Sequence, residues 1–261
     1  MVNPIYDKIG LKYDVTRRAD PEITATLKNL LGLETGHNIL DIGCGSGNYT
    51  VALEQFDVEM VGVDISEAML SQARKKSQTI SWVQADAFNL PFESNEFDGA
   101  ICTLALHHVG HTENVFCELY RVLKPNKHFV IFTSTPKQMQ QYWLCHYFPN
   151  MMQESCRSML SEDELISALY SSGFSQTRIA KYFVSNQLQD WFLLSGKYRP
   201  EIYCETSVRE GISSFAKTEH LNEVQTGIDN LKLDIKSGKI NSIIEKYESD
   251  LGDYLFVVAT A

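Results

Sequence analysis

Short apolar runs alternate with amphipathic segments along the first half of the chain. The apolar runs predict strands at 38–42, 60–63, 80–83, 97–103 and 128–133. Apolar residues at helical spacing between or before them predict helices over 21–31, 49–56, 66–75 and 112–123. Because strands and helices alternate and most strand runs are continuously apolar, we expect a parallel sheet with helices on both faces.

Polar residues and prolines mark where several of these helices begin or end. Asp20 followed by Pro21 predicts a cap and a proline at the first helical position. Ser66 and Thr112 are predicted to cap the helices that they precede, and the Lys124-Pro125 pair predicts the end of the second of these.

The pattern changes after Thr135. The stretch 136–158 is rich in aromatic residues and methionine and shows little periodicity. A capping box from Ser161 to Glu164 predicts a helix that ends near Gly173, and a sixth strand is predicted at 174–184. We expect 186–239 to be largely helical and 254–260 to form the last strand.

Composition narrows the function classes. With 261 residues and 44% hydrophobic content, the chain can bury one sizeable core with an inserted lid. Its net charge of −10 disfavours a nucleic-acid substrate, because phosphate binding depends on clustered Lys and Arg. No apolar run approaches the length of a membrane span and the start does not resemble a signal peptide, so we expect a cytoplasmic protein without membrane attachment.

The six cysteines show no C-x-x-C pair, so neither a zinc site nor a disulfide framework is expected, and no metal is predicted. Three of them, Cys145, Cys156 and Cys204, fall in the second half of the chain, which leaves metalloid methylation as a minor alternative.

A glycine-rich turn follows the first predicted strand. Residues 43–47 read Gly-Cys-Gly-Ser-Gly, and Asp64 ends the second strand. Glycines let a ligand approach the backbone closely, and an acid at that strand end can accept hydrogen bonds from ribose hydroxyls. The G-x-G-x-G spacing differs from the G-x-G-x-x-G of dinucleotide enzymes, but these two features alone leave a nicotinamide oxidoreductase open.

Five ordered motifs together resemble the class I S-adenosylmethionine-dependent methyltransferases, in their small-molecule branch of type 11 and ubiquinone/menaquinone-biosynthesis-like enzymes. The motifs cover 40–47, 62–70, 84–92, 97–109 and 118–125, and the resemblance extends over about residues 10–135. It implies an α/β, Rossmann-like fold with a seven-stranded mostly parallel sheet, an antiparallel last strand, helices on both faces, and a helical, aromatic cap.

The resemblance also implies a domain plan. Residues 1–135 would form the cofactor-binding core with an N-terminal gating arm, and 136–160 a lid insertion. Residues 161–184 would return a helix and a strand to the core, 185–250 would form the helical cap, and 251–261 would add the last core strand.

Roles for single residues follow from the same resemblance. S-adenosylmethionine, which leaves as S-adenosylhomocysteine, would be held by residues from each motif and from the gating arm. Its amino-acid part would lie along Gly43, Cys44 and Gly45, and its ribose on Asp64. Its adenine would lie among Ile65, Met69, Asp86 and Ala87, and its sulfonium near Leu104. The arm would add Tyr13 and Arg17.

The acceptor is expected to be a small molecule, whose identity and methylated atom the sequence does not reveal. Tyr142, Trp143, His146 and Tyr147 are candidate acceptor-binding residues, with simple packing as the alternative for each aromatic ring. His108 is a candidate general base, although a histidine pair common to enzymes with unlike substrates also fits a structural role. No catalytic dyad is required, because the methyl group of a sulfonium is already activated.

Two further questions stay open at this point. The chain would be a monomer or a homodimer. A protein that binds S-adenosylmethionine without turnover would need the same cofactor-facing residues and is the main alternative.

Overall fold

The computed structural model describes residues 13–261. The beginning of the expected gating arm, and the segment judged against a signal peptide, lie in residues 1–12, outside the described residues. Tyr13–Val15 form a short 3-10 helix, η1, at the start of the described chain.

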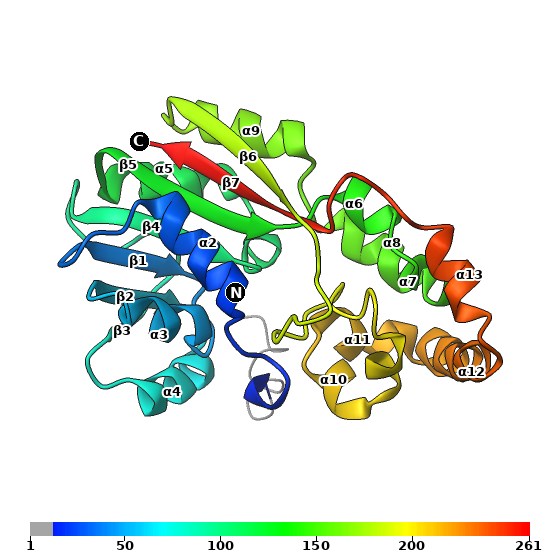
Figure 1. The fold of residues 1–261 in the computed structure, drawn as a ribbon. Helices are drawn as coiled ribbons and strands as arrows, with labels where there is room; N and C mark the ends of the chain where they lie inside the picture. Colours follow the sequence, from blue (N-terminus) through cyan, green and yellow to red (C-terminus); the bar gives the residue numbers. More distant parts are fainter. Residues whose placement is uncertain (1–12) are drawn as a thin grey trace.

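A single seven-stranded sheet has the order β3-β2-β1-β4-β5-β7-β6 (Figure 1). The strands are β1 (Asn38–Ile42), β2 (Glu59–Asp64), β3 (Ser81–Gln84), β4 (Phe97–Thr103), β5 (Leu123–Thr133), β6 (Gln176–Tyr182) and β7 (Tyr254–Thr260). β7 runs antiparallel to both of its neighbours, and the pairs among β1 to β5 are parallel. The predicted fold class is therefore confirmed.

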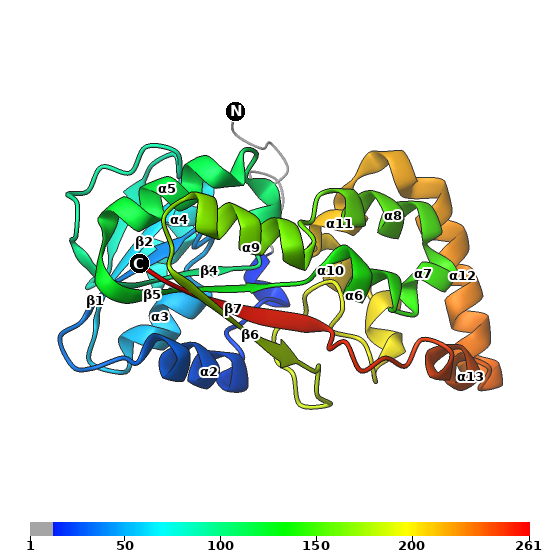
Figure 2. The same ribbon diagram turned by 90° about the horizontal axis from the view of Figure 1, so that it is seen from above.

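Helices cover both faces of the sheet (Figure 2). α2 (Pro21–Leu31) and α3 (Asn48–Glu54) lie on one face, and α5 (Thr112–Val122) and α9 (Glu162–Ser171) lie on the other. α4 (Glu67–Lys76) packs at the edge formed by β2 and β3. Neighbouring strand residues point to opposite faces, so Ile39 joins one apolar core and Leu40 the other.

Several helices begin at the polar residues that the sequence predicted as caps, and α5 does not. The Asp20 carboxylate accepts from the backbone N–H groups of Glu22 and Ile23, and Ser161 forms the predicted capping box with Glu164. The prediction that Thr112 caps α5 is wrong. The cap position is His111, which has a φ of 54° and makes no side-chain capping bond, so Thr112 is already helical.

A second lobe lies beyond the carboxyl ends of β1, β4 and β5 (Figure 1). Its helices are α6 (Pro136–Gln140), α7 (Leu144–Tyr147), α8 (Pro149–Arg157), η3 (Pro200–Cys204), α10 (Thr206–Glu210), α11 (Ser213–Ala216), η4 (Thr218–His220), α12 (Leu221–Ser237) and α13 (Ile240–Glu245). We call this lobe the cap.

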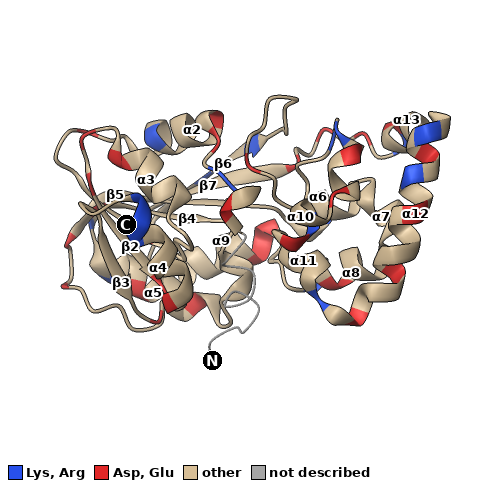
Figure 3. Ribbon diagram, turned by 90° about the horizontal axis from the view of Figure 1, so that it is seen from below, with Lys and Arg blue, Asp and Glu red and all other residues tan. Residues whose placement is uncertain are grey.

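Helix is less continuous in the cap than the sequence suggests. Residues 186–199 contain turns and bends rather than helix, although we expected 186–239 to be largely helical. Backbone groups in this stretch bond to the N-terminal segment instead. Acidic and basic positions are interspersed over both lobes (Figure 3). Within residues 13–261, no helix has both the length and the apolarity needed to span a membrane.

Candidate functional site

Two adjoining cavities lie where the sheet meets the cap. The first, of about 450 Å³, opens at the carboxyl ends of β1, β2 and β4 and just after β3. The second, of about 270 Å³, lies between the sheet and the cap. Tyr13, Arg17, Leu104 and His108 line both, so the two spaces share a wall. Ligands bound in the two cavities would therefore meet at this wall.

The glycine turn shapes the floor of the first cavity. The backbone N–H groups of Gly43 and Cys44 both donate to the carbonyl oxygen of Val63, at 2.8 and 3.0 Å. Gly43 has a φ of +67°, and a β-carbon there would stand 2.5 Å from the β-carbon of Ala105. Only glycine fits this position, because both the backbone conformation and the space exclude a side chain.

Asp64 is fixed by backbone donors at the end of β2. Its Oδ2 accepts from the N–H of Gly45 and its Oδ1 from the N–H of Ser66, both at 2.8 Å. Burial raises the pKa of Asp64, and these backbone hydrogen bonds oppose the rise. An ionised carboxylate has about four acceptor sites, so Asp64 can still accept from hydroxyl groups in the cavity.

The structure brings all the predicted cofactor residues to this one cavity. Tyr13, Arg17, Gly43, Cys44, Gly45, Asp64, Ile65, Met69, Asp86, Ala87 and Leu104 line it. Asp86 is exposed and turns one carboxylate oxygen to the backbone N–H of Phe88 at 3.1 Å. Leu104 has a φ of +54°, in the left-handed region that residues with a β-carbon seldom adopt. The shared wall thus contains a strained backbone position.

A buried ion pair joins Arg17, in the shared wall, to Asp190. Nε of Arg17 donates to Oδ1 of Asp190 at 2.5 Å, and the hydroxyl of Tyr49 donates to Oδ2 at 3.1 Å. The two charged side chains are 12% and 2% exposed. Burial acts to lower the pKa of Arg17, but Asp190 outweighs it and holds the pKa above its ordinary value. Asp190 was missed by sequence reasoning, because no motif surrounds it and its partner is 173 residues away.

The loop that carries Asp190 is also bonded to the N-terminal segment through the backbone. The N–H of Gln189 donates to a carboxylate oxygen of Asp20 at 2.9 Å. The N–H of Trp191 donates to the carbonyl oxygen of Thr16 at 3.1 Å. These bonds explain why the loop is not helical, since its donors are used across the interface.

Two neighbouring histidines stand beside the second cavity. They belong to η2 (Leu106–His108), and their ring centroids are 3.8 Å apart. Nδ1 of His107 is buried and has no hydrogen-bond partner among the described residues. Burial, followed by the charges of Lys217 and Arg17, lowers the pKa of His108 to about 4, and burial lowers that of His107 well below its ordinary value. Both rings are therefore neutral at pH 7.

The predicted acceptor-binding aromatics lie elsewhere. Tyr142, Trp143 and Tyr147 are buried in the apolar interior of the cap, and His146 is exposed. The hydroxyl of Tyr142 shares a hydrogen bond with that of Tyr203 at 3.1 Å. None of the four lines either cavity. The structure therefore favours the alternative in which the aromatic rings pack the interior of the cap, because the short helices of the cap bury their own aromatic side chains.

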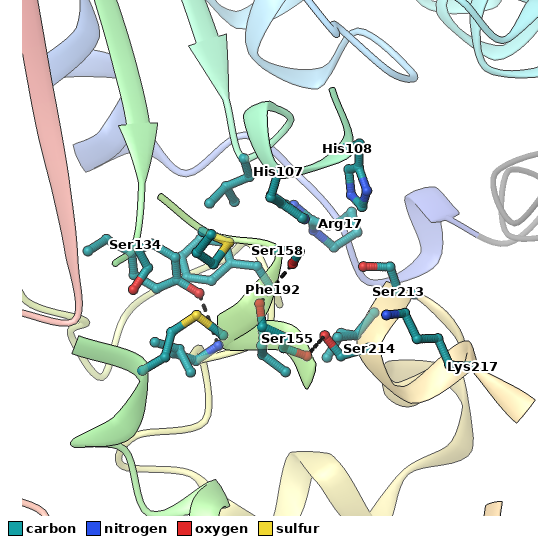
Figure 4. A pocket seen from close by; sticks show the side chains of 18 of the residues that line it. Arg17, His107, His108, Ser134, Ser155, Ser158, Phe192, Ser213, Ser214 and Lys217 are labelled. Atoms are coloured by element: carbon teal, nitrogen blue, oxygen red, sulfur yellow. Dashed lines mark hydrogen bonds between the residues drawn. The ribbon is translucent and has the colours of Figure 1, made fainter. Parts of the chain in front are cut away.

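A different set of side chains lines the second cavity (Figure 4). It combines apolar groups such as Met139, Phe192 and Tyr254 with a polar group of five serines and one lysine. The polar members are Ser134, Ser155, Ser158, Ser213, Ser214 and Lys217. No sequence signal pointed to them, since the serines are scattered singly or in pairs.

The three cap cysteines do not line either cavity. Sγ of Cys145 donates to the carbonyl oxygen of Met139 at 3.3 Å, and Cys156 is buried. Burial raises the pKa of the Cys145 thiol to about 11 and also raises that of Cys204. Protonated thiols outside the cavities give the metalloid alternative no support.

The buried carboxyl of Asp41 is expected to make the free energy of unfolding depend on pH. Its Oδ2 accepts from the hydroxyl of Thr50 at 2.6 Å, while Oδ1 is buried without a partner among the described residues. Burial raises the pKa of Asp41 to about 7, and the Asp64 charge adds to the rise. The folded chain therefore keeps a proton that the unfolded chain loses above its pKa of about 4.

We expect the free energy of unfolding to fall as the pH rises from about 4 to about 7, with this carboxyl contributing up to about 1.4 kcal/mol per pH unit. Urea unfolding at several pH values measures the slope. In Asp41→Asn the slope over this interval should become shallower. An unchanged slope would show that Asp41 titrates normally.

Comparison with known proteins identifies a matching family and a similar solved structure. The family described as Methyltransferase domain matches residues 40–131. A solved structure from Anabaena variabilis, assigned as a methyltransferase of an antibiotic biosynthesis pathway, is 33% identical, with a TM-score of 0.85, and covers 94% of this chain and 99% of its own.

Two curated relatives have named activities. The demethylmenaquinone methyltransferase of Oceanobacillus iheyensis is 25% identical over 69% of this chain and 90% of its own length. The 2-phytyl-1,4-naphtoquinone methyltransferase of Trichormus variabilis is 35% identical over 42% of this chain and 52% of its own. The similarity to the solved structure spans both lobes, whereas the second of these relatives matches a shorter segment.

Proposed function

The chain belongs to the class I S-adenosylmethionine-dependent methyltransferases, and from this membership we propose that its two cavities divide the reaction between them. The enzyme methylates a small-molecule acceptor with S-adenosylmethionine as the methyl donor. The first cavity would take the donor and the second the acceptor. The observation that carries this division is the shared wall of Tyr13, Arg17, Leu104 and His108, where the two ligands would meet.

The residues of the first cavity fit S-adenosylmethionine. Because Gly43 has no β-carbon, the turn packs directly against Ala105, and both residues line the cavity. Asp64 presents spare acceptor sites that match a pair of ribose hydroxyls. We assign the amino-acid part to Gly43, Cys44 and Gly45. The adenine would lie among Ile65, Met69, Asp86 and Ala87.

Arg17 has a double role in this proposal. Two of its N–H donors point to Asp190, at 2.5 and 3.3 Å. A guanidinium has five N–H donors, so others stay available for the carboxylate of the donor molecule. Its ring contact with Tyr13, at 4.8 Å from the centroid, holds both side chains at the wall.

When bound, S-adenosylmethionine would supply an activated methyl group for transfer to the acceptor, and the proton that the acceptor loses would pass to solvent. The chain's own residues exclude water and orient the acceptor. His108, the predicted base, has a pKa of about 4 and takes up protons weakly. We therefore propose that His107 and His108 chiefly accept hydrogen bonds from the acceptor and fix its orientation.

The acceptor class is proposed from the relatives and from the lining. Two relatives are named for quinone-type substrates. The apolar side chains of Met139, Phe192 and Tyr254 suit a flat ring. We propose a compact aromatic acceptor that is methylated at a hydroxyl or ring carbon. A cytoplasmic location, a monomeric or dimeric state and the lack of a nucleic-acid substrate stay predictions from the sequence.

Replacing Asp64 with alanine tests the cofactor assignment. We expect weaker binding of S-adenosylmethionine by about 1.5–3 kcal/mol, the scale of lost hydrogen bonds to a charged group. Titration calorimetry measures it, with Asp250→Ala as the control because that carboxylate is exposed and remote from both cavities. Equal affinities of the two variants would remove the ribose role of Asp64. Release of S-adenosylhomocysteine in an acceptor screen then tests turnover.

A further inference from the structure

The second cavity is positive although the chain is acidic. The sequence carries 33 acidic residues against 23 Lys and Arg. Within the described chain, the residues that line this cavity include Arg17 and Lys217 but no Asp or Glu. A cationic amine would therefore find no carboxylate on the lining, whereas an anion would find two cationic side chains.

Lys217 lines the cavity, but the carboxylate to which it is bonded does not. Its Nζ donates to Oε1 of Glu154 at 2.5 Å, and Glu154 does not line the cavity. The other oxygen of Glu154 lies 2.5 Å from Nε2 of His220, so one carboxylate is shared between two side chains. An ammonium group has three N–H donors, which leaves Lys217 able to bind a second anion.

The two positive charges on the lining are balanced differently. Arg17 faces Asp190, which is a dedicated and buried partner. Within residues 13–261, the ion-pair partner of Lys217 is Glu154, whose side chain is 35% exposed and is shared with His220. The unmet positive potential is consequently at the cap end. Burial lowers the pKa of both His107 and His108, and the positive charge of Lys217 acts in the same direction.

Hydroxyl groups accompany Lys217. Ser213 and Ser214 line the cavity beside it, and Ser155 donates to the hydroxyl of Ser214 at 2.8 Å. Figure 4 shows Ser213, Ser214 and Lys217 gathered at one end, across from His107, His108 and Arg17. An ammonium with neighbouring hydroxyls can hold a carboxylate by charge and by hydrogen bonds.

We propose that the methyl acceptor is a hydroxyaromatic acid whose carboxylate binds Lys217 with Ser213 and Ser214, while its nucleophilic end lies beside His107 and His108. This proposal rests on the proposed function and specifies its substrate class. It distinguishes the enzyme from one that acts on amines. It also gives the cap a definite part in specificity, since Lys217 lines the second cavity and not the first.

Binding measurements with defined probes test the proposal. The probes are a panel of hydroxybenzoates and hydroxynaphthoates, the methyl ester of each, and tyramine as a cation. Each is titrated by calorimetry into protein saturated with S-adenosylhomocysteine. We expect at least one acid to bind at least tenfold more tightly than its ester, and tyramine not to bind. If no acid binds, or if esters and acids bind alike, the proposal is overturned.

A variant tests whether Lys217 causes the preference for the acid over its methyl ester. In Lys217→Met the affinity for the acid should fall at least tenfold, that for the ester less than twofold, and that for S-adenosylhomocysteine not at all. Lys217→Arg should keep the preference, and Lys236→Met, which removes an exposed lysine of α12, should change nothing. An acid preference that survives Lys217→Met contradicts the assignment. If the wild-type chain does not bind S-adenosylhomocysteine, that result instead counts against the proposed function.

Discussion

Replacing Asp190 with alanine is expected to lower the free energy of unfolding by about 3–5 kcal/mol, the usual cost of leaving a buried charge without its partner. Arg17 is 12% exposed and pairs with Asp190 in the wall between the cavities. The change also removes the acceptor of the Tyr49 hydroxyl. Urea unfolding measures the effect, and Asp250→Ala provides an exposed acid as the control.

A double variant separates the loss of the partner from the loss of the residue. In Arg17→Met/Asp190→Leu neither charge remains buried, so much of the lost stability should return. If the double variant is as unstable as Asp190→Ala, the defect comes from packing or from Tyr49 rather than from the stranded guanidinium. If Asp190→Ala itself is as stable as the wild type, the pair is not a buried interaction in solution.

Replacing Gly43 with alanine is expected to abolish measurable binding of S-adenosylmethionine and to destabilise the fold. The added β-carbon would stand 2.5 Å from the β-carbon of Ala105, in a backbone with a φ of +67°. The left-handed conformation alone costs about 1–2 kcal/mol, and overpacking typically adds about 1–3 kcal/mol. Calorimetry with the cofactor and urea unfolding report the two effects separately.

Gly36 offers the matched control for that experiment. It also has a left-handed φ, of +80°, but no heavy atom lies within 4 Å of the position that a β-carbon would take there. Gly36→Ala should therefore lose only about 1–2 kcal/mol of stability and keep its cofactor affinity. Equal loss of affinity in both variants would mean that general instability, not the shape of the turn, weakens binding.

The residues that line the first cavity could be grouped from the sequence because that part of the site is local. The strand, the turn at Gly43 and the following helix are continuous in the chain, and Asp64 occupies the corresponding end of the next strand. Once the sheet is parallel, such strand ends must converge. The predicted bounds of β1, β4 and β7 also agree with the structure, because burial on both faces imposes apolar runs.

The second cavity was not predictable in the same way. Its lining combines single residues such as Ser155 and Lys217, which come together only when several short segments of the cap pack. The aromatic density around Trp143 pointed to a pocket, but the ring is 1% exposed and fills the interior of the cap. Asp190 lies in a loop ordered by contacts with Thr16 and Asp20, which no local pattern encodes.

The bonds between the loop at 189–191 and the segment at 16–20 have a practical consequence for engineering. A chimera that exchanges only residues 136–250 for those of a relative would bring a foreign loop against Arg17, Asp20 and Tyr49. The cap and the N-terminal segment are thus not independent modules. Any graft of a new cap has to carry its own version of the N-terminal segment with it.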